Sequence, residues 1–157
     1  MNKWPKQNEA AKFYGDPRGT DGKANRNWEK NQLGMITPPF QMTYAGHDIK
    51  GLTIHRKCAL SLMAVFTDIW HRSGKSQAMI DKWEVSIFGG SYNYRLKRNS
   101  NNLSMHAYAC AIDLSPASFP MHGDPTHTFV KPVMEAFAAE GWVNLVSDRM
   151  HFQAALL

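Results

Sequence analysis

The sequence contains no apolar run of the roughly 18 residues that a membrane-spanning helix needs. Its first residues, Met-Asn-Lys-Trp-Pro-Lys, also lack the apolar stretch of about 7–15 residues that a secretory signal peptide carries. These absences predict that the chain does not insert into a membrane. We therefore expect it to be made and kept in the cytoplasm of its host unless another factor releases it.

Cysteine is scarce, since Cys58 and Cys110 are the only two among 157 residues. In a cytoplasmic protein free buried thiols are the default, so we expect no disulfide framework. A chain of this length can bury a sufficient core without such staples. We expect a monomer with a single domain over residues 1–157, in which residues 1–35 wrap over a core formed by residues 36–157.

Acidic residues are in the minority, with 13 Asp and Glu against 18 Lys and Arg, and the net charge is +5. A basic surface attracts anionic polymers such as nucleic acid or cell wall. Only Arg95, Lys97 and Arg98 are clustered, and the sequence contains no aromatic-and-basic RNA motif and no recognition-helix pattern. We therefore expect general attraction to wall polymer and no nucleic-acid partner.

The apolar pattern mixes helices with strands that lie close together in the sequence. Ala59, Leu62, Phe66 and Ile69 recur at spacings of three and four, which predicts an amphipathic helix over 57–73. Further helices are predicted at 8–13, 76–83 and 129–140, strands at 40–45, 48–55, 84–88, 108–114, 142–146 and 150–154, and loops at 16–30 and 115–128. This order favours an α+β fold with a small antiparallel sheet and helices packed on it.

The residues with the most evident chemistry lie in Ser-Met-His-Ala-Tyr-Ala-Cys-Ala-Ile-Asp, residues 104–113, and in Asp-Arg-Met-His, which ends at His151. His106, Asp113 and His151 can bind zinc through three protein atoms and leave the fourth position open, as catalytic zinc sites do. Asp148 would then lie beside a water molecule as a general base. Taken alone, however, His and Asp at such spacings are more often structural.

Other candidate ligands are not placed by any motif. His122 and His127 lie in a predicted loop, where histidines are commonly solvated. Cys110 is better explained as a small apolar core residue. His55 and His71 lie at the two ends of the amphipathic helix, and we expect them to be structural or exposed.

Residues 104–113 resemble the Ser-x-His-x-x-Gly-x-Ala-x-Asp signature of the M15 peptidases, the group of D-alanyl-D-alanine carboxypeptidases and phage endolysins. Its positions are occupied by Ser104, His106, Ala111 and Asp113. Asp-Arg-Met-His-Phe-Gln at 148–153 resembles the second motif of the family, and Phe-Gly-Gly-Ser-Tyr-Asn-Tyr-Arg at 88–95 is similar to the segment that supplies a substrate-binding arginine. The likeness is to short phage or prophage members and runs from about Trp4 to the end.

Two departures from the family pattern stand out. The glycine of the signature is Ala109 here, which costs about 1 kcal/mol or more if the position needs a positive φ. The link at 143–147 is short, whereas relatives often carry a longer Trp- and Gly-rich loop that forms one wall of the substrate cleft.

The resemblance implies a Hedgehog/DD-peptidase type of fold and one catalytic Zn²⁺ held by His106, Asp113 and His151. It also implies that Asp148 acts as the general base and that Arg95 contributes to catalysis by binding a substrate carboxylate or the oxyanion.

Further substrate contacts are expected from the residues around this site. Arg98 is an alternative to the neighbouring arginine, and the sequence does not separate the two. Ser104, Tyr92 and Trp142 are candidates for lining the cleft, although a turn position for the serine and core positions for the aromatics are the alternatives.

The implied substrate is the stem peptide of bacterial peptidoglycan. We expect cleavage of the L-alanyl-D-glutamate bond by a phage-type endolysin, with D-alanyl-D-alanine carboxypeptidase or dipeptidase activity as the alternative. A non-catalytic, zinc-containing module that binds the cell wall is a further alternative, although such a module has no need of Asp148.

Overall fold

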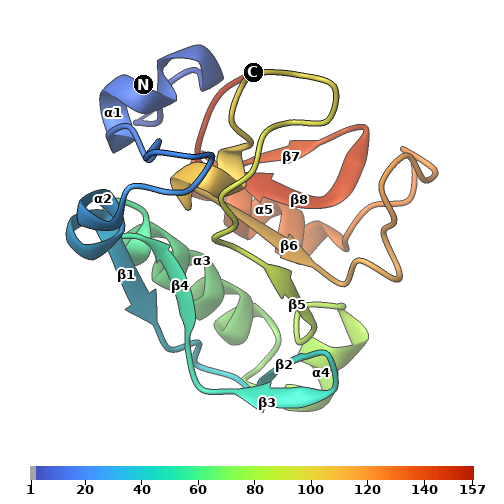
Figure 1. Cartoon of the computed structure of the whole chain (residues 1–157). Coiled ribbons are helices and arrows are strands. Elements are labelled where there is room, and N and C mark those ends of the chain that lie inside the picture. The colour runs from blue at the N-terminus through green and yellow to red at the C-terminus, as the bar shows by residue number, and fades with distance from the viewer. Residues whose placement is uncertain (1–2) are drawn as a thin grey trace.

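The computed structural model describes residues 3–157 and has a four-stranded antiparallel sheet at its centre (Figure 1). The strand order is β5 (Phe88–Gly90), β6 (Ala111–Leu114), β8 (Asp148–Gln153) and β7 (Val143–Leu145). Within residues 3–157, two smaller two-stranded sheets and five α-helices complete an α+β fold, which confirms the predicted class.

The two inner strands of the central sheet determine the geometry of the candidate site. β6 is largely buried, as its run of Ala111, Ile112 and Leu114 predicts. In the register of β6 with β8, Asp113 lies directly opposite His151. Directly opposed residues of an antiparallel pair project their side chains on the same face of the sheet, about 5 Å apart.

The helices α3 (Ala59–Arg72) and α5 (Lys131–Ala139) pack against each other and provide much of the core. The predicted apolar face of α3 is buried, as Leu62, Phe66 and Ile69 show. α5 is joined to the central sheet by Phe137, whose ring stacks on that of Phe152 at 3.8 Å. These two predicted helices are therefore confirmed, and so is the short helix α4 (Gln77–Lys82), whose first turn is capped by Ser76.

The region of the predicted strands 40–45 and 48–55 divides into two separate pairings. β2 (Met42–Tyr44) and β3 (His47–Ile49) form the predicted hairpin. β4 (Leu52–His55) instead pairs with β1 (Leu33–Ile36), a strand that the sequence analysis missed. The prediction of one continuous strand over 48–55 is wrong, because its two halves have different partners.

The N-terminal segment lies against the C-terminal end of the chain at one end of the molecule (Figure 1). η1 (Gln7–Glu9) and α1 (Ala10–Tyr14) confirm the predicted helix at 8–13. The chain ends are joined by backbone hydrogen bonds, including Gln7 N–H to the Leu156 carbonyl at 2.8 Å. Met1 and Asn2, which belong to the predicted wrap, lie outside the described residues.

Two local predictions need correction. The predicted loop at 16–30 contains the start of α2 (Arg26–Gln32), which begins where the Asn25 side chain accepts hydrogen bonds from two backbone amides. The predicted strand at 108–114 starts only at Ala111, because η2 (Met105–Tyr108) occupies the preceding residues. Across residues 3–157, no helix combines the length and the apolar character needed to cross a membrane.

Candidate metal centre

Three side chains from three elements converge beside the central sheet. His106 comes from η2, Asp113 from β6 and His151 from β8. His106 Nε2 lies 3.2 Å from Asp113 Oδ2, and His151 Nδ1 lies 3.2 Å from Asp113 Oδ1. One ligand atom from each residue can be chosen so that all three lie within 4.8 Å of one another. The structure thus brings together the three residues that were predicted as metal ligands.

The outer nitrogens of both imidazoles face hydrogen-bond acceptors. His106 Nδ1 lies 2.8 Å from the carbonyl oxygen of Ser91. His151 Nε2 lies 2.9 Å from Gln153 Oε1, and the Gln153 amide nitrogen donates to the Ala155 carbonyl at 3.0 Å, which fixes the amide orientation. A neutral imidazole has one N–H, so these acceptors place the proton of each ring on its outer nitrogen.

The inner nitrogens therefore present lone pairs to each other and to a carboxylate. His106 Nε2 and His151 Nδ1 are 3.1 Å apart. Among the described residues, Asp113 Oδ1 is buried and has no hydrogen-bond partner, although it lies within ion-pair distance of His151 Nδ1. Converging acceptors without donors repel one another, and a cation between them removes that repulsion. Two imidazole nitrogens and one carboxylate are a donor set that fits Zn²⁺.

The charge state of Asp113 agrees with a role as a ligand. Burial opposes its ionisation. When a proton on the inner nitrogen of His106 or His151 takes the place of a metal cation, hydrogen bonds and charge from these imidazoles outweigh burial and hold the pKa of the Asp113 carboxyl well below its usual value. The residue is therefore a carboxylate over the physiological range, which is the form that binds a metal.

Asp148 lies at the start of β8 and is 8% exposed. Burial raises the pKa of its carboxyl, and the nearby Asp113 raises it further, while His151 and His106 lower it in part. Its Oδ1 is buried without a hydrogen-bond partner in residues 3–157. A desolvated carboxyl with free acceptor atoms beside a charged cluster is typical of a functional site.

The two arginine candidates lie on the hairpin that precedes η2. Arg95 and Arg98 are exposed, and within the described part of the chain neither forms an ion pair. The backbone carbonyl of Arg95 accepts a hydrogen bond from Ser104 N–H at 3.0 Å. Among the described residues, Arg95 therefore has no carboxylate partner that would make it an ion pair holding the loop.

The remaining predicted substrate residues have structural partners. The Tyr92 hydroxyl donates to Glu29 at 2.7 Å. Ser104 Oγ accepts from the His106 backbone N–H at 3.2 Å, which caps η2 and so helps to position the ligand. Both residues are close in sequence to groups of the candidate metal centre, Ser91 and His106, and their role in substrate binding stays a prediction.

The burial of Trp142 contradicts the expectation that this residue lines the substrate cleft. It is 4% exposed, and its ring packs against Trp4 and Phe137. Its indole N–H donates to Ser61 Oγ at 2.9 Å. A side chain enclosed and hydrogen-bonded in this way belongs to the core and offers no surface to a substrate.

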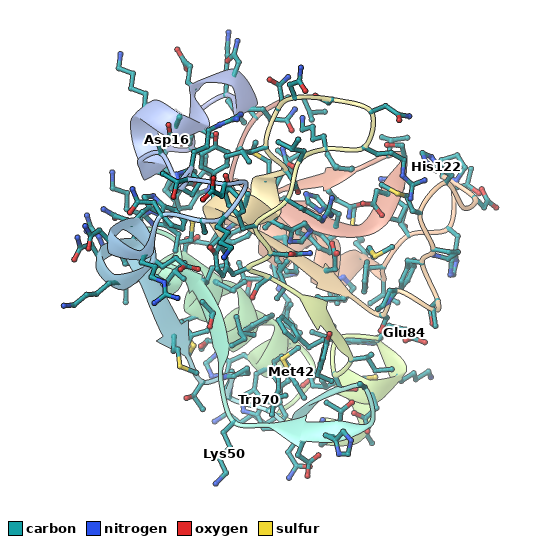
Figure 2. The ribbon with its side chains drawn as sticks, viewed as in Figure 1. Asp16, Met42, Lys50, Trp70, Glu84 and His122 are labelled. Carbon is teal, nitrogen blue, oxygen red and sulfur yellow. The ribbon has the colours of Figure 1, made fainter. Side chains whose placement is uncertain are left out.

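The rival ligands lie outside the cluster. Cys110 is fully buried, as expected of a core residue, and its thiol donates to the Met105 carbonyl at 3.4 Å. His127 stacks on Phe119 with ring centroids 4.7 Å apart. His122 is exposed (Figure 2) and contributes only a nearby charge that lowers the pKa of Asp148.

The sequence analysis missed the groups that orient the two imidazoles. Gln153 lies two residues after His151 on the same strand, and alternate strand residues share a face, so this partner was recoverable from the sequence. The Ser91 carbonyl was not, because backbone acceptors have no sequence signal. Asn144 was also missed, although its amide donates to the carbonyls of Arg149 and His151 across an irregular part of the β7–β8 pairing.

A comparison with protein families finds one match in the same region. A family model described as D-alanyl-D-alanine carboxypeptidase matches residues 98–154, the part of the chain that carries the three converging residues and the buried carboxyl at 148. No match was found among curated proteins or among solved structures.

Proposed function

We propose, from the M15 peptidase membership that the match over residues 98–154 supports, that the chain is a zinc-dependent peptidase of peptidoglycan stem peptides. The observation that carries the proposal is the convergence of His106 Nε2, His151 Nδ1 and the Asp113 carboxylate, while an acceptor faces the outer nitrogen of each ring. A purely structural cluster would pair each acceptor with a donor.

His106 Nε2, Asp113 and His151 Nδ1 would hold the ion. Zinc bound by three protein atoms polarises a peptide carbonyl and lowers the pKa of a water molecule to about 7. The protein contributes the buried position of these ligands and the orientation of both rings by Ser91 and Gln153.

Asp148 is the proposed general base. It would accept the proton of the attacking water and pass it to the leaving amine. Its burial favours this role, because desolvation raises the pKa of the carboxyl toward the working pH while the free Oδ1 remains available to a proton. The expected consequence of Asp148→Asn is a loss of about 10²–10⁴ in kcat with zinc still bound.

Arg95 is proposed to bind a carboxylate of the substrate or the developing oxyanion, with Arg98 as the alternative. Both guanidinium groups are exposed and free of ion pairs within residues 3–157, so they remain available to an anionic ligand. A guanidinium pairs with a carboxylate through two parallel hydrogen bonds. Tyr92 and Ser104 stay candidates for contacts near the same hairpin.

Two bonds of the stem peptide are candidate targets. The resemblance to short phage members favours the bond between L-alanine and D-glutamate and a role as an endolysin. The description of the matching family model favours removal of the terminal D-alanine. We propose the first and keep the second, because the same ligands and base serve both reactions and only the shape of the substrate cleft separates them.

The test is digestion of purified peptidoglycan by the zinc-loaded protein, followed by mass spectrometry of the released fragments. New N-terminal glutamate would establish an L-alanyl-D-glutamate endopeptidase. Loss of one terminal alanine would establish a carboxypeptidase instead.

Asp148→Asn is the matched blank for this digestion, because it replaces one atom and leaves the three ligands in place. Products that persist at the parent rate in this variant would contradict the assigned base. The absence of new termini, with zinc bound, would overturn the peptidase and leave a wall-binding module.

A further inference from the structure

A separate cavity of about 580 Å³ lies between the N-terminal segment and the hairpin loop that precedes η2. Its lining includes Lys6, Arg18, Lys97, Asn102, Met105 and Tyr108. In Figure 1 the loop around residue 100 stands beside the C-terminal end of the chain, and the cavity lining joins this loop to residues 6–11, so segments distant in sequence form its walls. None of the candidate metal ligands lines this cavity.

The walls are tied together across the opening by side chains. Arg18 donates to the Asn101 carbonyl at 3.0 Å, and Lys97 Nζ lies 3.4 Å from Gln7 Oε1. Lys97 N–H also donates to the Asn102 carbonyl at 2.8 Å, which closes the hairpin. The cavity is therefore a feature of the folded chain that the N-terminal segment and this hairpin build jointly.

The charged side chains that line the cavity are all cationic, and the terminal carboxylate of Leu157 is the negative group in its lining. Lys6, Arg18 and Lys97 line it, and no acidic side chain does. Within residues 3–157 none of these three cations forms an ion pair. Glu9 follows the lining residue Asn8 in sequence but does not line the cavity. Asp16, which Figure 2 labels, accepts a hydrogen bond from the Arg18 backbone N–H at 3.0 Å and is not part of the lining either. An excess of cations in a concave surface attracts anionic groups.

The cavity and the candidate metal centre share one element. Met105 and Tyr108 of η2 line the cavity, and His106 of the same turn belongs to the converging cluster. An anionic polymer held in the cavity would therefore contact the same short helix that carries one of the candidate metal ligands.

We propose that this cavity binds phosphate or carboxylate groups of a cell-wall polymer and so holds the wall beside the candidate metal centre. The inference rests on the proposed function for the identity of the polymer and on the charge and lining of the cavity for its anionic chemistry. Phosphate of a phosphodiester polymer and carboxylate of the peptidoglycan itself are the two sources of that chemistry.

The test is co-sedimentation of the zinc-loaded Asp148→Asn protein with purified insoluble cell walls at increasing salt. In that background, the double variant Lys6→Ala/Lys97→Ala should bind the walls about 25-fold more weakly, at about fivefold for each cation removed from an anionic surface. Its affinity should also depend less steeply on salt, because fewer counterions are released.

The control is Lys50→Ala/Lys82→Ala, which removes the same charge at exposed positions away from the cavity; Lys50 lies at the opposite end of the molecule from Asp16 (Figure 2). This control should change the affinity by less than about twofold. Equal losses in the two double variants, or no loss in either, would overturn the proposal, because net charge alone would then explain the attraction.

Two further arms identify the ligand. Inorganic phosphate should compete with walls for the Asp148→Asn protein and not for its cavity variant. Walls stripped of phosphodiester polymers by acid should lose affinity if phosphate is the source, and keep it if peptidoglycan carboxylate is. Random duplex DNA could also displace the protein from the walls. If it does so at a phosphate concentration below that of the walls, nucleic acid is the preferred ligand and the proposed wall polymer is overturned.

Hydrolysis of a soluble stem peptide separates this inference from the proposed function. Lys6→Ala/Lys97→Ala in the otherwise intact chain should hydrolyse the peptide at the parent rate while binding walls weakly. No hydrolysis by the intact chain would refute the peptidase but leave the cavity result standing, whereas normal hydrolysis with unchanged wall binding would refute the cavity alone.

Discussion

His55 is as buried as His106 and His151, yet its ring nitrogens have different partners. Its Nε2 lies 2.9 Å from the Tyr14 carbonyl, and its Nδ1 accepts the Lys57 backbone N–H at 3.0 Å. One donor and one acceptor therefore satisfy a neutral ring completely. The other two rings each satisfy only the outer nitrogen and direct the inner one at a further acceptor.

The difference shows how a structural histidine can be told from a candidate ligand. Burial alone does not separate them, because all three side chains are nearly inaccessible. What separates them is whether each acceptor faces a donor. A buried polar group normally has its partner, so acceptors that face acceptors indicate a site that suits a cation.

The largest expected effect is the loss of metal from the cluster. His106→Ala and His151→Ala should each reduce bound zinc from about one ion per chain to none and abolish peptidase activity, because two protein ligands do not hold a catalytic zinc. Elemental analysis after dialysis measures the content. His71→Ala, an exposed histidine at the end of α3, is the control and should keep both metal and activity.

Retention of zinc in either ligand variant would show that the replaced histidine is not a ligand. An acceptor that faces another acceptor would then fail to distinguish a ligand from a structural histidine. Loss of zinc in the His71 variant would likewise show that the metal lies elsewhere.

The second-largest expected effect is the loss of folding stability that acid causes through His55. Burial lowers the pKa of His55 to about 4, and the neighbouring cations Arg56 and Lys57 add to this, although the Tyr14 carbonyl opposes it. An unfolded histidine has a pKa of about 6.5, so the unfolded chain binds more protons between these values and stability falls as the pH drops from about 7 to 4. The loss attributable to His55 is up to about 3 kcal/mol.

Urea unfolding of the zinc-free protein at pH 7 and pH 4.5 measures this loss. In His55→Gln, which does not titrate, the difference between the two pH values should be smaller by about 2–3 kcal/mol. His71→Gln is the matched control and should keep the parent dependence. An unchanged pH dependence in His55→Gln would show that the buried ring does not carry the acid sensitivity.

A smaller effect is expected from Gln153, which orients His151. Gln153→Leu removes the acceptor of the Nε2 proton and should weaken zinc binding about 10–100-fold, as loss of such outer partners generally does. Gln153→Glu keeps an acceptor at the same position and should retain most of the affinity. Competition with a chromogenic chelator measures the zinc affinity of both variants. Equal affinities would show that an acceptor at residue 153 does not orient His151 for metal binding.

The sequence predicted best where local pattern and packing agree. The apolar stripe of α3 follows one face of a helix, and the burial of Leu62 and Phe66 confirms it. The three ligands were predicted through two short motifs, one with His106 and Asp113 and the other with His151, and the register of β6 against β8 places Asp113 opposite His151. In both cases the information lies in short stretches of chain.

Failures arose where the determining partner lies far away in sequence. β1 was missed because its pairing with β4 joins residues about twenty positions apart and its own sequence, Leu-Gly-Met-Ile, has no alternation. α2 was missed because Trp28 is its only buried residue, so no apolar stripe exists to be seen. Trp142 was assigned to a cleft because aromatic residues serve both cores and binding sites.

The smallest expected effect comes from the stretch of backbone that is hydrogen-bonded to both His55 and the first ligand, His106. Ala109 has φ +54 and ψ +33, a left-handed conformation that costs a residue with a Cβ about 1 kcal/mol or more. Its carbonyl accepts the backbone N–H of His55 at 2.7 Å, while its own N–H donates to His106 at 3.0 Å. The residue therefore holds this conformation between the structural histidine and the first ligand.

Ala109→Gly should relieve that strain but lose a buried methyl group and gain freedom in the unfolded chain, so its stability should lie within about 1 kcal/mol of the parent. Ala107→Gly loses the same methyl group at an equally buried position without positive φ, and should destabilise by about 1–2 kcal/mol. Urea unfolding of the two zinc-free variants gives the difference directly. Equal destabilisation would mean that Ala109 carries no strain, and that the alanine in place of the glycine of the signature is tolerated there without cost.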